Sequence, residues 1–382
     1  MRAAVSENKK ISIQDTHKPA LCDFGNVGAI VKVLGCGLCG SDIVKFLNDS
    51  TQKVLGHEVV GEIVDIKPKF LSKFKIGDKI VLGHHVPCMK CEYCENKNYS
   101  MCKQFKETNI RPGGFAEYIY VSPLHLKNTV FKVPKNLDDM EISFMEPLAC
   151  CVRAVKRAEV RKGSTSLIIG LGSIGLLMGQ AVKAFKGDVI GCDLIEERVA
   201  LANNLNFDAS IKFEDNDTTS EKIKSMTCGI GADIVFMTSG SDKAIEFAIK
   251  SVRDGGTVLV FSSVPNDTSG YTNNDIYYRE LKILGSYSPS PKDLALAHKL
   301  LTKKKVVVKY LSTSYQLEDL GEAIQDTISN KTLKAYIKVD NSKRFPERTQ
   351  ENIDYISDNQ AEKIIQNDLK TENYNNNLEI DK

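Results

Sequence analysis

Four cysteines lie within fifteen residues and follow the spacing C-x-x-C-x-x-C-x7-C: Cys88, Cys91, Cys94 and Cys102. Four thiolates at this spacing can surround Zn²⁺ as a tetrahedron, which leaves no open coordination position, so such a site serves to hold a loop. An iron–sulfur cluster also takes four cysteines, although this run lacks the proline that ends the ferredoxin pattern. Zinc is the favoured metal. His84 and His85 precede the run, and we interpret them as surface residues or neighbours of a metal rather than ligands.

A second group of candidate ligands is spread over three segments. A thiol, an imidazole and two carboxylates occur in Cys36–Asp42, Gly56–Glu58 and Glu146–Pro147. Such a set could bind a metal that keeps one position open for a substrate. Each member also has a structural interpretation, because a lone His or Glu is usually structural and the pair Cys36/Cys39 could be redox-active or inert.

A glycine motif follows a short apolar run. The residues Gly170-Leu171-Gly172-Ser173-Ile174-Gly175 match G-x-G-x-x-G, come directly after Leu167–Ile169 and open a predicted helix. In a dinucleotide site the first glycine makes the tight turn, the second lets the backbone approach a pyrophosphate, and the third lets the helix pack on its strand. The helix N-terminus then receives the phosphates. The alternative is a glycine-rich turn that binds nothing.

An acid stands where this motif requires one. Asp193 ends the next predicted strand, 18 residues after Gly175, and a carboxylate there would bind the ribose hydroxyls and repel a 2′-phosphate. NAD is therefore favoured over NADP, although Arg198 is a nearby cation that could tolerate the phosphate. Asp193 would also suit the N-terminus of the helix that follows.

Two kinds of secondary structure must position these groups. Up to about residue 150 the pattern predicts short strands bounded by Gly, Pro or Asp, among them Ala29–Leu34, Val59–Ile66 and Lys79–Leu82. A helix over Leu148–Ala158 follows. From there strands and helices alternate, which indicates a doubly wound parallel sheet. We predict five strands in it: Ser166–Ile169, Asp188–Cys192, Ala232–Phe236, Gly256–Phe261 and Lys282–Tyr287.

The C-terminal third carries two further patterns. A helix over Asp293–Leu301, a strand-like Val306–Val308 and a strand over Tyr336–Val339 are predicted to return to the first domain. Residues 341–382 contain eight Asn, six Lys or Arg and nine Asp or Glu, with few apolar residues. That composition is typical of a poorly ordered tail.

Composition limits the classes of function. With 382 residues the chain is long enough for two domains. A formal charge of +2 excludes a broad surface for nucleic acid or anionic membrane. We find no apolar run of the roughly 20 residues that span a bilayer and no signal peptide at the N-terminus, so we expect a cytoplasmic protein. The eleven cysteines are odd in number and unevenly clustered, which favours metal over disulfides.

Taken together, the order of these motifs resembles the zinc-dependent medium-chain dehydrogenases, especially the branch of polyol (sorbitol or iditol) and threonine dehydrogenases. The resemblance covers residues 1 to about 340. It implies an α/β fold with a GroES-like catalytic barrel over 1–152, to which 288–340 returns, and a Rossmann domain over 153–287. It also implies a homodimer or homotetramer.

The resemblance assigns roles to individual residues. Cys39 in Cys-Gly-Ser-Asp, His57 in Gly-His-Glu and Glu146 in Glu-Pro-Leu-Ala match the family's catalytic zinc ligands, with Glu58 as an alternate ligand. The four clustered cysteines match its structural zinc, which makes two zinc ions per chain. Ser41 matches the hydroxyl that takes the proton of the alcohol. Where the family places a His to pass this proton on, the chain has Val44, with Lys45 beside it.

The implied activity is an NAD-dependent oxidation of a secondary alcohol, in which zinc lowers the pKa of the hydroxyl and a hydride passes to the nicotinamide. The expected substrate is a polyol, sugar derivative, cyclitol or amino alcohol. Within the same family, a dehydrogenase specific for threonine or a simple alcohol is an alternative. A different class is a regulator that binds zinc and nucleotide without catalysis.

Overall fold

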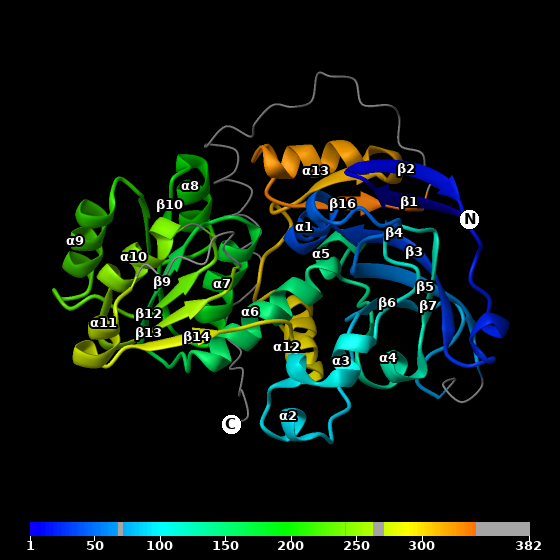
Figure 1. Ribbon diagram of the computed structural model, residues 1–382, viewed down its shortest axis with the longest axis horizontal. Coiled ribbons are helices and arrows are strands. Elements are labelled where there is room, and N and C mark those ends of the chain that lie inside the picture. Colours follow the sequence, from blue (N-terminus) through cyan, green and yellow to red (C-terminus); the bar gives the residue numbers. More distant parts are fainter. Residues whose placement is uncertain (68–71, 241, 263–270, 341–382) are drawn as a thin grey trace. The chain divides into compact units, whose positions relative to one another are not determined.

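The computed structural model describes residues 1–67, 72–240, 242–262 and 271–340 (Figure 1). The tail predicted for 341–382 lies outside these residues. Within them, no helix is both long enough and apolar enough to cross a membrane.

The C-terminal half of the fold is built on a six-stranded parallel sheet with strand order β11-β10-β9-β12-β13-β14. Its strands are β9 (Thr165–Ile169), β10 (Asp188–Asp193), β11 (Ala209–Lys212), β12 (Ala232–Met237), β13 (Val252–Val260) and β14 (Lys282–Gly285). The order reverses between β9 and β12, and ligands of such sheets bind beyond the carboxyl ends of the strands at this reversal. The prediction of five strands was wrong by one. It missed β11, an edge strand whose residues are half-buried or exposed and so lack an apolar run.

Helices cover both faces of this sheet: α6 (Met145–Arg157), α7 (Ser173–Ala184), α8 (Glu196–Asn204), α9 (Asn216–Met226) and α10 (Asp242–Ser251). A further helix, α11 (Asn273–Arg279), precedes β14 and buries none of its residues. Successive residues of β9 point to opposite faces, as a strand requires. Ile168 packs in a core with residues of α6 and α7, whereas Leu167 and Ile169 pack in another with residues of α9 and α10. Both cores come from the strand-and-helix alternation read in the sequence.

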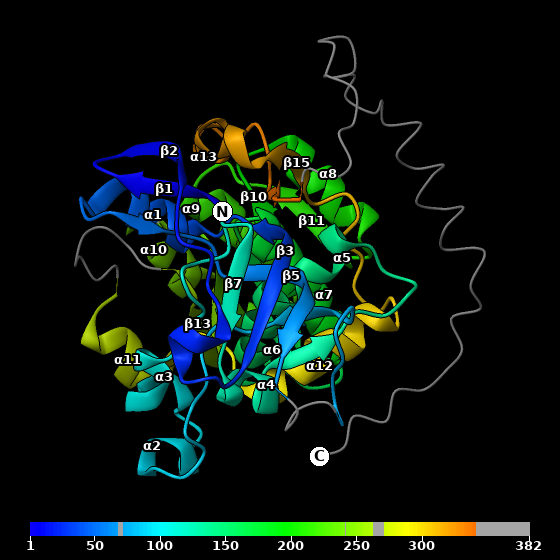
Figure 2. The ribbon, with the colours of Figure 1, turned by 90° about the vertical axis from the view of Figure 1, so that its right-hand side faces the viewer.

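The N-terminal half contains two further sheets. A three-stranded sheet has the order β2-β1-β4, and a seven-stranded sheet has the order β15-β16-β3-β5-β6-β8 with β7 also paired to β3 (Figure 2). The strands are β1 (Arg2–Glu7), β2 (Lys10–Asp15), β3 (Ala29–Gly37), β4 (Lys53–Val54), β5 (Glu58–Ile66), β6 (Lys79–Leu82), β7 (Tyr118–Val121), β8 (Val130–Lys132), β15 (Thr313–Gln316) and β16 (Ala335–Lys338). β16 pairs antiparallel with β3, so the end of the described chain lies beside its first third.

One predicted strand is absent from these sheets. Val306–Val308 forms no strand, although Val306 and Val308 are buried in the core that also contains residues of α6 and α12. A short apolar run reports burial, and burial alone does not determine a strand. The remaining helices are η1 (Leu21–Phe24), α1 (Gly40–Asn48), α2 (Glu92–Glu95), η3 (Tyr99–Met101), α3 (Lys103–Glu107), α4 (Pro123–Asn128), α5 (Asp139–Ser143), α12 (Pro291–Thr302), η4 (Leu317–Asp319) and α13 (Leu320–Ile328).

Candidate functional site

The structure brings the sulfur atoms of Cys88, Cys91, Cys94 and Cys102 within 4.8 Å of one another. The Sγ atom of Cys94 lies 3.6 Å from that of Cys91 and 3.9 Å from that of Cys88. A Zn–S bond of about 2.3 Å implies a tetrahedron with edges of about 3.8 Å, so this spacing fits zinc. The backbone N–H of Cys88 also donates to the Sγ atom of Cys102 at 3.4 Å, a contact that stabilises a thiolate.

The electrostatics of this four-cysteine lobe also favour a cation at its centre. Burial and the neighbouring sulfur atoms raise the pKa of Cys94 to about 12, while the backbone N–H of Lys90 contributes most to lowering the pKa of Cys88 to about 6. Sulfur atoms this close cannot all be thiolates without a compensating positive charge. A divalent metal would supply that charge.

Three members of the second predicted group also meet. The ligand atoms of Cys39, His57 and Glu58 lie within 4.8 Å of one another. Cys39 is the N-cap of α1, and Glu58 is the first residue of β5 with His57 directly before it. His57 and Glu58 are buried, and Cys39 is partly buried. Strand β3 leads into Cys39 and pairs with β5, so the backbone itself holds these groups together.

Asp42 orients this cluster, a role that sequence reasoning missed. One carboxylate oxygen lies 3.3 Å from Nδ1 of His57 and accepts from the backbone N–H of Gly56, and the other accepts from the backbone N–H of Cys39. Burial opposes the charged form of His57, yet the charges of Asp42 and Cys39 raise the pKa of His57 well above its ordinary value. A carboxylate on Nδ1 leaves Nε2 free for a metal, as in many metal sites. The signal was available, because an acid three residues after a helix cap often binds back to it.

Lys334 holds Glu58, which sequence reasoning also missed. The Nζ atom of Lys334 lies 2.8 Å and 2.6 Å from the two carboxylate oxygens of Glu58 and donates to the carbonyl oxygen of Leu38 at 3.1 Å. Both side chains are buried, so the charges neutralise each other out of water. A Cβ atom at Gly37 would lie 2.0 Å from the same carboxylate, which explains the glycine there. The two charged residues are 276 positions apart, and no local pattern signals such a pair.

Glu146 lies in the first turn of α6 and forms a second cluster with His57 and His84, whose ligand atoms lie within 4.8 Å of one another. Nδ1 of His84 is 3.8 Å from one carboxylate oxygen of Glu146, and the thiol of Cys150 is also 3.8 Å from it. Burial raises the pKa of Glu146 to about 7, although the charge on His57 opposes this shift, and no Lys or Arg of the described residues forms an ion pair with it as Lys334 does with Glu58. This carboxylate therefore gains most from a metal.

His84 is not the surface residue that one interpretation of the sequence suggested. Its side chain is 13% exposed, and its ring lies 4.5 Å from that of His57 and 4.0 Å from that of His85, measured between centroids. Burial, followed by the charge on His57, lowers the pKa of His84 well below its ordinary value, so its ring is neutral. His85 points elsewhere, with Nδ1 against the carbonyl oxygen of Thr108, and burial lowers its pKa to about 4.

The predicted proton-handling residues lie on α1. Ser41 is exposed in the first turn of this helix, two residues after Cys39. Val44 is 52% exposed, and Lys45 beside it is exposed as well.

The glycine motif forms the turn between β9 and α7. Gly170 has φ of +91°, a left-handed conformation that favours glycine. Gly172, two residues later, is the N-cap of α7. A Cβ atom at Gly175 would lie 1.8 Å from the carbonyl oxygen of Gly170, so the third glycine is needed for close packing. A Cβ atom at Gly172 would meet only the Arg198 guanidinium at 4.0 Å, so the backbone there is open to a ligand. Ser173 and Ile174 begin the helix, and in the part of the chain that the structure describes no N-cap side chain bonds to its first N–H groups, which could receive phosphate oxygens.

Asp193 ends β10 beside this turn. Its two carboxylate oxygens accept from the backbone N–H groups of Leu171 at 2.5 Å and Ile195 at 2.9 Å. The N-cap of α8 is Ile195, so Asp193 is not the cap of that helix. Arg198 lies 3.8 Å from Asp193 and donates to the side-chain oxygen of Asn330 at 2.7 Å. These bonds fix the carboxylate at the edge of the turn, and its oxygens can still accept further hydrogen bonds.

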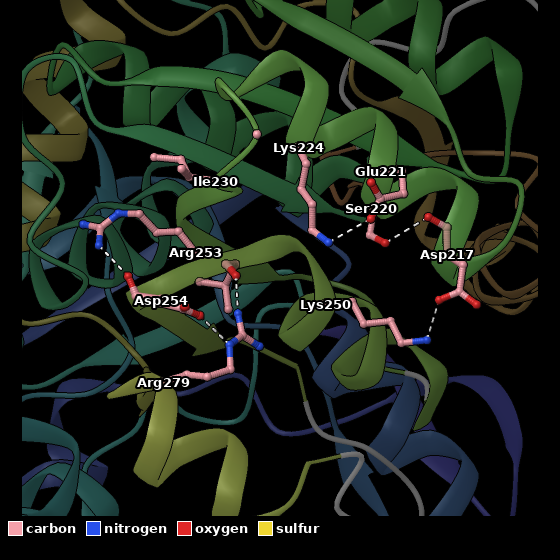
Figure 3. Close-up of a pocket in the computed structure, with 11 residues that line it drawn as sticks. Asp217, Ser220, Glu221, Lys224, Ile230, Lys250, Arg253, Asp254 and Arg279 are labelled. Carbon is pink, nitrogen blue, oxygen red and sulfur yellow. Dashed lines mark hydrogen bonds and ion pairs between the residues drawn. The ribbon is translucent and has the colours of Figure 1, made fainter.

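A separate hollow of about 810 Å³ lies among α9, α10, α11 and the start of β13 (Figure 3). Each of the four cations that line it forms an ion pair with an acid: Lys224 with Glu221, Lys250 with Asp217, Arg253 with Asp233, and Arg279 with Asp254. None of the metal-ligand clusters found in the described residues includes a residue of this hollow. In the described residues, these clusters are instead the four-cysteine lobe and the two groups that share His57.

Comparison with known proteins places the chain in a family. The family model of the alcohol dehydrogenase GroES-like domain matches residues 25–135, and that of zinc-binding dehydrogenases matches residues 173–303. A sorbitol dehydrogenase from Halalkalibacterium halodurans is 30% identical over 315 residues, which cover 80% of this chain and 90% of its own. The chain belongs to the zinc-dependent medium-chain dehydrogenase family. The resemblance read from the motifs is thereby confirmed.

Two further proteins similar to this chain support the same assignment. A D-xylulose reductase A from Aspergillus oryzae is 30% identical over 351 residues, 86% of this chain and 93% of its own. The crystal structure of an Escherichia coli oxidoreductase/dehydrogenase of unknown specificity, 27% identical, superposes with a TM-score of 0.78 and covers 89% of this chain and 99% of its own. The predicted α/β fold with GroES-like and Rossmann parts is confirmed, and this dehydrogenase is an oxidoreductase of a family that uses zinc and a nicotinamide cofactor. Glu146 and Lys334 lie outside both matched segments.

Proposed function

We propose that the protein is an NAD-dependent, zinc-dependent dehydrogenase that oxidises a secondary alcohol of a polyol, sugar derivative, cyclitol or amino alcohol. The observation that carries the proposal is a pair of clusters that share His57, one with Cys39 and Glu58 and the other with His84 and Glu146, whose donor types suit a metal that keeps a position open. The names of the relatives, sorbitol dehydrogenase and D-xylulose reductase, support the substrate class. Residues 1–152 and 288–340 would form the catalytic unit, and 153–287 the nucleotide-binding unit.

In this proposal Cys39, His57 and Glu146 hold the catalytic zinc, and the four-cysteine lobe holds a second, structural zinc. Glu146 is preferred to Glu58 as the third ligand because Lys334 already neutralises Glu58, whereas Glu146 is buried and has no Lys or Arg ion-pair partner among the described residues. When bound, zinc lowers the pKa of a substrate hydroxyl. Asp42 fixes the ring of His57 and the backbone at Cys39, so the ligands need little rearrangement.

The choice of NAD rests on Asp193. Its carboxylate stands at the turn where an adenosine ribose would lie and would repel a 2′-phosphate. Arg198 is turned to Asn330 and lies close to Asp193, which neutralises part of its charge. When bound, the nicotinamide accepts the hydride.

Proton release needs no histidine in this proposal. The side-chain hydroxyl of Ser41 accepts the proton of the alcohol, and because Ser41 is exposed, the proton passes from its Oγ atom to water. Val44 then replaces the family's histidine without blocking the route.

A substrate screen tests the proposal. Sorbitol, xylitol, inositol, threonine and simple alcohols are offered with NAD, and the absorbance of the reduced cofactor is followed. We expect turnover of a polyhydroxylated substrate, and C39S should lower kcat/KM by at least about 100-fold, or about 2.7 kcal/mol. C228S, which changes an exposed thiol, is the matched control and should keep full activity.

The same screen separates the alternatives. Turnover of threonine or a simple alcohol alone would change the substrate class within the family. Absence of turnover, with zinc and nucleotide still bound, would identify a non-catalytic regulator. The homodimer or homotetramer implied by the family stays a prediction, which light scattering on the purified protein would test.

A further inference from the structure

Two possible ligand clusters share the imidazole of His57. One contains Cys39 and Glu58, and the other contains His84 and Glu146. The proposed function uses residues from both, but it leaves His84 without a role.

The ring of His84 is free to bind a metal. In the described part of the chain, its ring nitrogens make no hydrogen bond, and one carboxylate oxygen of Glu146 lies 3.8 Å from Nδ1. The side chain is only 13% exposed, and polar atoms with so little access to water normally have a partner. Three donors from His57, His84 and Glu146 are of the types that zinc binds.

The backbone of His84 is held rigidly, as expected of a ligand. Its carbonyl oxygen accepts from Nε2 of His125 at 2.8 Å, and Nδ1 of His125 accepts in turn from the hydroxyl of Ser122 at 2.7 Å. The preceding Gly83 donates its N–H to the carbonyl oxygen of Thr129 and accepts from the Thr129 hydroxyl. His125 and Thr129 are both almost completely buried. These contacts position the backbone from which the imidazole of His84 extends.

Glu58, the other side chain that could bind the metal beside His57, is already paired with a lysine. Both carboxylate oxygens of Glu58 lie within 2.8 Å of Lys334 Nζ, and breaking this pair would leave a buried ammonium without a partner. Of the two nearby side chains that could complete the coordination, Glu58 is thus committed to Lys334 and His84 is free.

We propose that His84 is the fourth protein ligand of the catalytic zinc in the substrate-free protein, with Cys39, His57 and Glu146. This inference rests on the proposed function, which places that zinc. Four protein ligands leave no open position, so His84 leaves the ligand set when an alcohol enters. His84 then acts as a displaceable ligand, and the resting site is closed.

Zinc release to a chromophoric chelator tests the inference on the full-length holoprotein. The wild type should release two zinc ions in two phases, and C39S should remove one phase while C91S removes the other. H84N should speed the phase assigned by C39S at least tenfold, because loss of an orienting neighbour alone already costs a metal site about 10–100-fold in affinity. The matched control is H85N, which changes the adjacent, partly buried imidazole and should leave that phase unchanged.

A second measurement needs no variant. With cobalt replacing zinc in the catalytic site, X-ray absorption at the cobalt edge should fit two imidazole ligands in the substrate-free wild type and one after addition of the polyol found in the screen. One imidazole before addition, or an unchanged H84N release rate, would overturn the role of His84. If C39S leaves both zinc phases intact, the proposed catalytic zinc itself is wrong.

Discussion

Lys334 should stabilise the fold and keep Glu58 in place, and K334M removes its charge while keeping most of the side-chain volume. The ammonium lies 2.6 Å from the carboxylate, which at an effective dielectric constant of about 20 corresponds to an attraction of about 6 kcal/mol. Part of that attraction offsets the cost of burying both charges. Breaking such a pair typically costs about 3–5 kcal/mol, because the remaining charge is buried without a partner.

The assay is unfolding of the wild type, K334M, E58Q and the double variant, followed by circular dichroism. At about 2–4 °C per kcal/mol, K334M should unfold about 6–20 °C below the wild type. The double variant should lose at least about 2 kcal/mol less than the sum of the single losses. K331M is the control, since Lys331 is exposed and its pair with Asp326 at 3.4 Å contributes less than about 1 kcal/mol.

The pH dependence of this effect has a definite sign. Burial opposes the charge on Lys334, but Glu58 raises the pKa of Lys334 above its ordinary value. The stabilisation is therefore complete below about pH 10.5 and is lost as pH rises through the raised pKa. The difference between wild type and K334M should stay constant from pH 6 to 9. Additive single losses, or a difference that disappears below pH 9, would refute the buried ion pair.

Three other predictions concern the remaining parts of the site. D193A should weaken NAD binding by about 1–2 kcal/mol, as measured by calorimetry, and NADP binding much less; equal losses would mean that Asp193 does not contact the ribose. G175A should lower the unfolding temperature because its Cβ atom would lie 1.8 Å from the Gly170 oxygen, whereas G172A should fold normally and weaken only nucleotide binding. In metal-free protein, burial raises the pKa of Glu146 to about 7. The protonated carboxyl therefore stabilises the fold fully below about pH 4.5, and this contribution of up to about 3 kcal/mol is lost as the pH rises to 7. E146Q should abolish this part of the pH dependence of unfolding.

Local spacing was sufficient for the parts of the site that are made within one segment. The four cysteines lie within one stretch of fifteen residues, and G-x-G-x-x-G is a single turn between β9 and α7, so their geometry follows from their sequence neighbours. Strands of the parallel sheet were predicted well where they are buried on both faces. The edge strand β11 was missed because its residues are half-buried or exposed, so its sequence has no apolar run. Val306–Val308 was mistaken for a strand because its side chains pack in a core although its backbone pairs with no strand.

The sequence by itself determined the family, the mixed α/β fold and the residue types available for chemistry. Tertiary structure decided which of those residues act together. Lys334 reaches Glu58 across 276 positions because β16 pairs with β3, and His84 meets Glu146 where the loop after β6 lies against α6. These contacts pair one carboxylate with a lysine and leave the other for the metal that we propose. No periodicity contains that information, because charge pairing in a buried site depends on distance in space and not on spacing along the chain.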